Sequence, residues 1–212
     1  MLNDTGLQYM FTGAIAASYY GRPRTTLDID IVIAVERSEL VRLSKALQRA
    51  SLVVHQKRLE AAWESDHRIV TLNDRKSAHT VDVIFTDTEL DRIPGRVSGL
   101  PTYYEAAESL ILPKLRMLKV TIQPERAATD RQDIKAILES SKIDLKSLRK
   151  KSEAESTIAI FDDLIRTWSR YAQIKRFSAC CRDSIKSIFQ FPRDRSDLWH
   201  VGIRLTVSYM CR

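Results

Sequence analysis

The sequence contains few of the residues that mark special classes of protein. It has three cysteines among 212 residues, and two of them, Cys180 and Cys181, are adjacent. This number and spacing gives no disulfide framework and matches no zinc pattern. No run of about 18 or more apolar residues occurs, so no transmembrane helix is expected, and the N-terminus lacks the basic and apolar regions of a signal peptide. We therefore expect no membrane partner and a cytoplasmic location.

Acidic residues are also outnumbered by basic ones. The net charge is +7, while 44% apolar and 29% charged residues are ordinary for a chain that buries a core. A basic excess favours a polyanionic partner such as a nucleotide or RNA. A surface rich in lysine gives the same total, so the charge alone leaves both interpretations open. The densest basic segment, our predicted RNA surface, comprises Lys142, Lys146, Arg149, Lys150 and Lys151.

Strand and helix patterns alternate up to about residue 100, and helical patterns dominate beyond it. Strands are predicted at Leu27–Val35, Arg68–Leu72 and Thr80–Phe85, and Leu7–Phe11 is either a short strand or the end of a helix. Helices are predicted at Ala14–Tyr20, Glu36–Ala50, Gln56–Glu64, Tyr103–Leu118, Thr129–Glu139, Leu145–Lys151 and Glu153–Trp168. We expect a core at 1–100, a helical part at 101–176 and a tail at 177–212 whose pattern predicts no regular structure.

Two acids stand one residue apart in a strand that otherwise looks buried, Asp28-Ile29-Asp30. Side chains alternate faces along a strand, so Asp28 and Asp30 share one face. Two like charges on one face cost free energy unless a cation is near. Mg²⁺ is commonly held by one or two carboxylates plus substrate phosphates. The pair therefore suggests a metal site, although solvated or salt-bridged acids give the same pattern.

Three further residues strengthen the metal interpretation. Gly13 opens a helix of small residues, and a glycine lets the backbone approach a phosphate closely. Arg24, in the loop before the acids, is placed to meet phosphate or to pair with the acids. Asp82 lies in the apolar strand 80–85. It either faces water at a sheet edge or, if its strand neighbours the first, joins the two acids as a third carboxylate and accepts a proton.

The sequence order of these residues resembles the nucleotidyltransferase superfamily of DNA polymerase beta. Gly13-Ala14 is followed after thirteen residues by Asp28-Ile29-Asp30-Ile31 and later by Val81-Asp82-Val83. The string "GAIAASYYGRPRTTLDIDI" is similar to the small prokaryotic members, the AbiEii-like toxins and MNT-like enzymes. In "ESLILPKLRML" and "DRQDIKAIL", Lys114 and Asp133 match a recurring Lys and Asp. The resemblance covers about residues 7–140.

The resemblance implies an α+β fold, a small mixed sheet flanked by helices with a helical C-terminal part. It implies transfer of a nucleoside monophosphate from an NTP such as ATP to a hydroxyl of RNA (tRNA) or protein. The metal would be Mg²⁺ or Mn²⁺, held by Asp28, Asp30 and Asp82, which would also be the catalytic residues.

For the nucleotide, the resemblance implies contacts from Gly13, Ala14, Arg24 and Lys114, although a lysine on an amphipathic helix is more often a surface residue. Ala14 replaces the usual Ser or Gly and can serve only through its backbone. A toxin would have a cognate antitoxin as partner. The alternative is a catalytically inactive protein of the same fold that binds nucleic acid or regulates.

Overall fold

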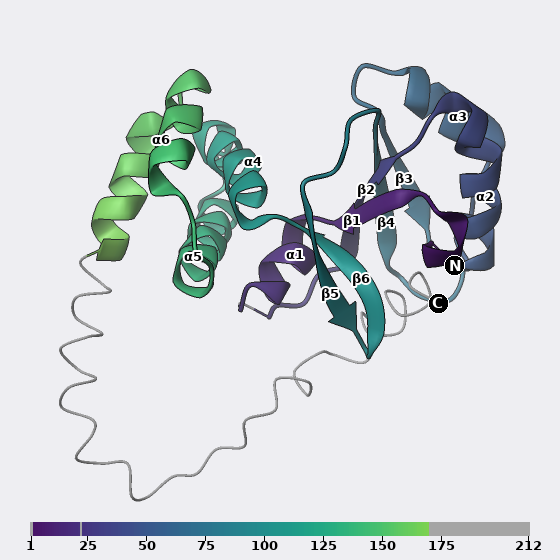
Figure 1. Cartoon of the computed structure of the whole chain (residues 1–212), viewed down its shortest axis with the longest axis horizontal. Coiled ribbons are helices and arrows are strands. Elements are labelled where there is room, and N and C mark those ends of the chain that lie inside the picture. Colours follow the sequence, from purple (N-terminus) through teal and green to yellow (C-terminus); the bar gives the residue numbers. More distant parts are fainter. Residues whose placement is uncertain (1, 22, 170–212) are drawn as a thin grey trace, which may run out of the picture. The chain divides into compact units, whose positions relative to one another are not determined.

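The computed structural model of the chain describes residues 2–21 and 23–169 (Figure 1). The chain divides after Leu110 into two compact units, and each is described by itself. The predicted tail at 177–212, with Cys180 and Cys181, lies outside the described residues. Among the described residues, no helix is both long and apolar enough to cross a membrane.

The first unit is built on a six-stranded sheet with the strand order β3-β4-β2-β1-β6-β5. The strands are β1 (Gln8–Phe11), β2 (Asp28–Ala34), β3 (Ile69–Asn73), β4 (Thr80–Thr86), β5 (Arg92–Val97) and β6 (Leu100–Glu105). The β2–β4 and β1–β6 pairs are parallel, whereas the β1–β2, β3–β4 and β5–β6 pairs are antiparallel. The sheet is therefore mixed, and the predicted α+β class is confirmed.

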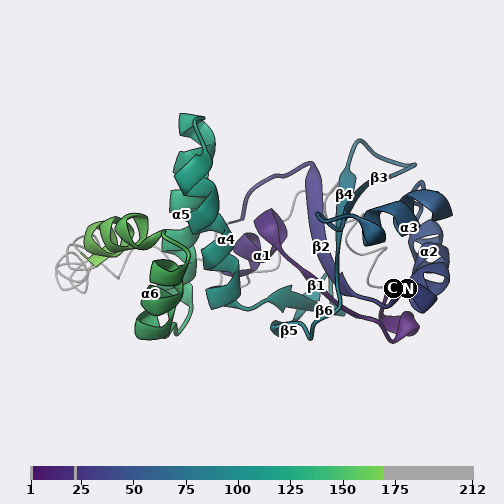
Figure 2. The same ribbon diagram turned by 90° about the horizontal axis from the view of Figure 1, so that it is seen from above.

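Helices cover both faces of this sheet (Figure 2). The helices of the unit are α1 (Gly13–Tyr19), α2 (Leu40–Arg49) and α3 (Gln56–Glu64), with short 3-10 turns η1 (Asn3–Thr5) and η2 (Arg37–Glu39). Helices α2 and α3 lie on one side of the sheet, and α1 lies on the other. Each of these helices overlaps a range that the sequence predicts.

The alternation along the central strands decides which side chains form the core. Ile29, Ile31 and Ile33 of β2 are completely buried, as are Val81 and Val83 of β4. Residues between them in the sequence point to the opposite face, where Asp30 and Asp82 are half-buried. Aliphatic burial on one face thus leaves the acids together on the other.

The hairpin of β5 and β6 was missed by sequence analysis. Pro94 is compatible with β5 because β5 is the edge strand of the sheet, where a missing N–H on the open side costs no ladder bond. The turn at Ser98-Gly99 has positive φ at both residues, 49° and 80°, which is the geometry of a tight hairpin turn. The helix predicted from Tyr103 is wrong at its start, because residues up to Glu105 belong to β6.

The second unit is helical in the part that the structure describes. Helix α4 (Ala107–Val120) starts before the division and runs through Pro113, and it is followed by α5 (Pro124–Ser140) and α6 (Leu145–Ala154). Residues 158–169 are also helical. The buried side chains of this unit include Ile134, Ile137, Leu148, Phe161 and Leu164. The prediction of helices in this part of the chain is confirmed.

Candidate active site

Two of the predicted carboxylates lie side by side on neighbouring strands. Strand β2 runs parallel to β4 with Asp30 directly opposite Asp82 and Asp28 opposite Thr80. Residues directly opposite each other point to the same face of a sheet. The structure therefore brings Asp82 next to the Asp28–Asp30 pair, and the alternative of an edge-strand aspartate is wrong because β3 pairs with the far side of β4.

Threonine hydroxyls orient two of the three acids. The Thr80 hydroxyl donates to Oδ1 of Asp28 at 2.7 Å, and the Thr71 hydroxyl, from β3, donates to Oδ1 of Asp82 at 2.6 Å. Thr71 is also the register partner of Asp82. Each hydroxyl fixes one oxygen of a carboxylate without neutralising its charge. The hydroxyls thereby hold the two carboxylates in defined orientations.

Gly13 lies directly against the third acid. It has a φ of +57°, and a Cβ built on it would be 2.1 Å from Oδ2 of Asp30. The residue before it, Thr12, donates its backbone N–H to the carbonyl oxygen of Asp30 at 3.0 Å. Helix α1 therefore begins on the carboxylate face of the sheet, and only glycine fits at its first position.

The two other predicted nucleotide contacts in this unit differ in accessibility. Ala14 is 5% exposed, so its side chain belongs to the core and only its backbone could meet a ligand. Ser18 is also buried and donates its hydroxyl to the carbonyl of Ala14 at 2.8 Å, so it does not replace the missing serine. Arg24 is half-buried in the loop that precedes β2.

Lys114 lies in the second unit and is a buried residue of α4. Its Nζ donates to Oδ2 of Asp133 at 2.8 Å and to Oδ1 of Asp130 at 3.1 Å. The interpretation as a surface lysine is wrong, because Lys114 is 7% exposed. Its role as a phosphate contact stays a prediction. In the structure the ammonium group of Lys114 lies between two carboxylates of α5, those of Asp130 and Asp133.

The carboxylates offer the oxygen ligands that a divalent metal ion such as Mg²⁺ prefers. Among the described residues, no group of three His, Cys, Asp or Glu side chains converges as a ready-made ligand set. Mg²⁺ seldom uses such a set and is usually bound by one or two carboxylates together with substrate phosphates. Asp28 and Asp30, which share one face of β2, supply those hard oxygen donors, and Asp82 lies opposite Asp30 on the adjacent strand. The residues fit an ion that is completed by the nucleotide.

Sequence analysis missed two residues that extend this polar face. Glu105, at the end of β6, is 8% exposed and accepts a hydrogen bond from the Thr12 hydroxyl. Thr12 follows the last residue of β1, which lies between β2 and β6 in the sheet. No sequence signal marks Glu105, because a single acid after Tyr103-Tyr104 has no distinguishing period and the pattern there predicts the start of a helix.

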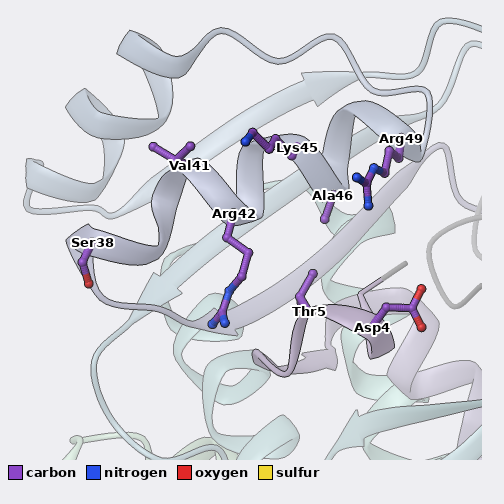
Figure 3. A pocket seen from close by; sticks show the side chains of 8 residues that line it. All are labelled: Asp4, Thr5, Ser38, Val41, Arg42, Lys45, Ala46 and Arg49. Carbon is purple, nitrogen blue, oxygen red and sulfur yellow. The ribbon is translucent and has the colours of Figure 1, made fainter.

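A separate cavity of about 430 Å³ lies along α2, away from all the predicted site residues (Figure 3). The side chains around it come from η1, η2 and α2 and include Arg42, Lys45 and Arg49. These three basic residues are three and four positions apart, so they lie on one side of α2. Arg42 is paired with Glu39. This basic surface is unrelated to the carboxylate face.

Comparison with known proteins supports the class of fold. No protein-family model matches the chain, and no curated protein sequence matches it. The structure is similar to the crystal structure of an antigenic nucleotidyltransferase-like protein from Paracoccidioides brasiliensis, with a TM-score of 0.52, 16% identity and coverage of 79% of this chain and 87% of that chain. The fold is therefore that of nucleotidyltransferase-like proteins.

A second solved structure is the solution structure of the antibiotic-resistance factor ANT(2'')-Ia. Its TM-score is 0.49 at 15% identity, with coverage of 84% of this chain and 91% of that chain.

Proposed function

We propose that this protein is a metal-dependent nucleotidyltransferase. The observation that carries the proposal is the placement of Asp30 opposite Asp82 on parallel strands, with the glycine turn at Gly13 in contact with Asp30. A sheet face that gathers acids is unfavourable for a purely structural protein, because like charges repel. Substrate phosphates bound through a divalent cation make the same arrangement favourable.

In this proposal the carboxylates have different roles. Asp28 and Asp30 would hold the divalent ion, and Asp82 faces the acceptor. The acceptor hydroxyl oxygen forms a bond to the α-phosphorus of the NTP, and the bond to the β-phosphate oxygen breaks, so that pyrophosphate leaves. The proton of the hydroxyl passes to Asp82. Thr71 holds one oxygen of Asp82 by a hydrogen bond of 2.6 Å, which fixes the orientation of this carboxylate.

Mg²⁺ or Mn²⁺, when bound, would stabilise the charge that develops on the attacking and leaving oxygens. Backbone N–H groups at Gly13 and Ala14 would contact the triphosphate, since the side chain of Ala14 is buried. Arg24, in the loop before β2, is the nearest cation in the sequence to the two acids and would balance the phosphate charge. Lys114 would contribute a further phosphate contact only after leaving Asp130 or Asp133.

We further propose an acceptor hydroxyl on RNA, such as tRNA, or on a protein, and a role as the toxin of a toxin–antitoxin pair. The net charge of +7 favours RNA. The toxin role rests on the resemblance of the Gly13-to-Asp30 segment to AbiEii-like toxins.

The decisive experiment is incubation with each labelled NTP in turn, Mg²⁺, and either total tRNA or a cell extract. We expect one NTP to label a macromolecule in a reaction that EDTA abolishes. Asp30→Asn should remove the label, whereas Asp66→Asn, a change at an exposed acid outside the site, should not. Absence of label with every NTP, together with RNA binding that needs no metal, would instead support a non-catalytic nucleic-acid-binding protein.

A further inference from the structure

Glu105 is a buried acid to which the proposed reaction assigns no role. It is 8% exposed, and one of its oxygens accepts a hydrogen bond from the Thr12 hydroxyl. A buried carboxylate is costly unless it is hydrogen-bonded. Glu105 lies at the end of β6, beside Thr12, the N-cap residue of α1. This position suggests that the buried carboxylate determines where that helix begins.

The hydroxyl of Thr12 does not accept the hydrogen bond that is usual for a residue at the start of a helix. Thr12 is the N-cap residue of α1, and a threonine there normally accepts a hydrogen bond from an N–H of the first turn. No such bond is present at Thr12. The hydroxyl donates to Glu105 instead. The orientation of Thr12 is therefore set by β6 rather than by its own helix.

The other end of α1 is also attached to Glu105. Tyr20, the C-cap residue, donates its hydroxyl to the carbonyl oxygen of Glu105 at 2.8 Å. A single residue of β6 thus binds both ends of a seven-residue helix, through its carboxylate at Thr12 and through its backbone at Tyr20. Such a short helix has little stability of its own, so these anchors determine its position.

Thr12 transmits this position to the metal-binding carboxylate. Its N–H donates to the carbonyl oxygen of Asp30 at 3.0 Å. The next residue, Gly13, contacts the Asp30 carboxylate so closely that a Cβ would collide with it. A displacement of Thr12 therefore moves both the backbone and the side-chain surroundings of Asp30.

We propose that Glu105 is a positioning residue for the metal site. Through the Thr12 hydroxyl it fixes the turn at Gly13 and thereby the carboxylate of Asp30. This inference rests on the proposed function, because it assumes that Asp30 is a metal ligand. Groups that orient a ligand through a hydrogen bond commonly contribute about 10- to 100-fold to metal affinity.

The test is Mn²⁺ binding to the full chain in the presence of a non-hydrolysable NTP, measured by electron paramagnetic resonance, with stability followed by chemical denaturation. Thr12→Val removes the hydroxyl and keeps the side-chain shape, whereas Thr12→Ser keeps the hydroxyl. We expect Thr12→Val to weaken Mn²⁺ binding about 10-fold or more, and Thr12→Ser to stay within a few-fold of the wild type.

Glu105→Ala should weaken binding by a similar factor. Adding Thr12→Val to Glu105→Ala should cause no further loss, because both changes break the same hydrogen bond. Glu105→Gln, which keeps an acceptor oxygen for the Thr12 hydroxyl, should stay within a few-fold of the wild type. If Glu105→Ala does not fold, the comparison of Thr12→Val with Thr12→Ser carries the test.

Two outcomes would overturn the inference, and they can be told apart. If the wild type binds Mn²⁺ and Thr12→Val or Glu105→Ala changes only the free energy of unfolding, the pair has a structural role and the proposed function stands. If the wild type itself binds no Mn²⁺, the proposed metal site is wrong and the positioning role falls with it.

Discussion

Gly13 and Asp30 are in direct contact across the carboxylate face. A methyl group on the Cα of Gly13 would lie 2.1 Å from Oδ2 of Asp30, and the glycine has a φ of +57°. Both facts require glycine at this position. The contact links the turn that begins α1 to the carboxylate that we assign to the metal.

Gly13→Ala is therefore expected to displace Asp30 and to abolish metal-dependent nucleotide binding, measured by calorimetry with a non-hydrolysable NTP. Gly6→Ala is a matched control, because Gly6 has a φ of +70° and nothing within 4 Å of its added Cβ. Each change should cost about 1–2 kcal/mol of stability from the left-handed backbone. If both variants bind nucleotide normally, the contact has no functional role.

Asp82 should affect the chemical step more than nucleotide binding. A general base contributes about 100- to 10,000-fold to the rate. We expect Asp82→Asn to leave NTP affinity within a few-fold and to lower the single-turnover rate at least about 100-fold. Asp28→Asn, which removes a ligand, should weaken both. Normal transfer by Asp82→Asn would show that another group accepts the proton.

The predicted RNA surface is the basic segment from Lys142 to Lys151, most of which lies in α6. Arg149 is paired with Asp162 at 2.8 Å, so Lys146 and Lys150, exposed and one helical turn apart, remain the better candidates. Each lost phosphate contact lowers the salt dependence of log affinity by about one unit. Lys146→Ala with Lys150→Ala should therefore reduce the slope in RNA-binding titrations.

The charge-matched control pair for this experiment lies on α2 and combines Lys45→Ala with Arg49→Ala. It should leave the slope of the RNA-binding titrations unchanged. If the α2 pair reduced the slope more than the α6 pair, RNA would bind at the basic residues around the cavity of Figure 3 instead.

Lys114 should be important for the stability of the helical unit. Its removal leaves Asp130 and Asp133, both buried, without their cation. Breaking a buried ion pair in this way typically costs about 3–5 kcal/mol. Lys114→Ala should lower the free energy of unfolding by that amount, whereas Lys119→Ala, exposed on the same helix, should change it little. Unchanged stability with weaker NTP binding would favour the phosphate role.

The raised pKa of Tyr20 leads us to expect that the free energy of unfolding falls at alkaline pH. Burial, followed by the neighbouring Tyr19 and Glu105, raises the pKa of Tyr20 above its ordinary value of 10.0. The unfolded chain therefore releases this proton first as the pH rises. The contribution of Tyr20 is complete below about pH 10 and declines above it. Denaturation at increasing pH should show a shallower decline for Tyr20→Phe, and equal declines would contradict the assignment.

Several features of the site could be predicted because they depend only on local chain geometry. The two-residue period of a strand determines that Asp28 and Asp30 share a face opposite Ile29 and Ile31. The same period places Asp82 opposite to the buried Val81 and Val83. The sequence by itself therefore determined which side of each strand is acidic, and the helices that it predicted in the first unit are present.

Strand order and register were decided by the tertiary structure alone. Asp30 and Asp82 are 52 residues apart, and only the parallel pairing of β2 with β4 makes them opposite each other. That pairing depends on how the intervening helices and β3 pack, which no local pattern encodes. Glu105 likewise acquired a role only when β6 placed it beside Thr12, since a lone acid after two tyrosines has no distinguishing period.

In the helical unit, the burial and the partners of Lys114 likewise could not be predicted from the sequence. Its position on an amphipathic helix is compatible with a surface or a buried residue, and its partners Asp130 and Asp133 follow 16 and 19 residues later on another helix. The sequence determined the residue types and their faces, because those depend on neighbours along the chain. The tertiary structure decided which charges meet, because burial and ion pairing depend on contacts between distant segments.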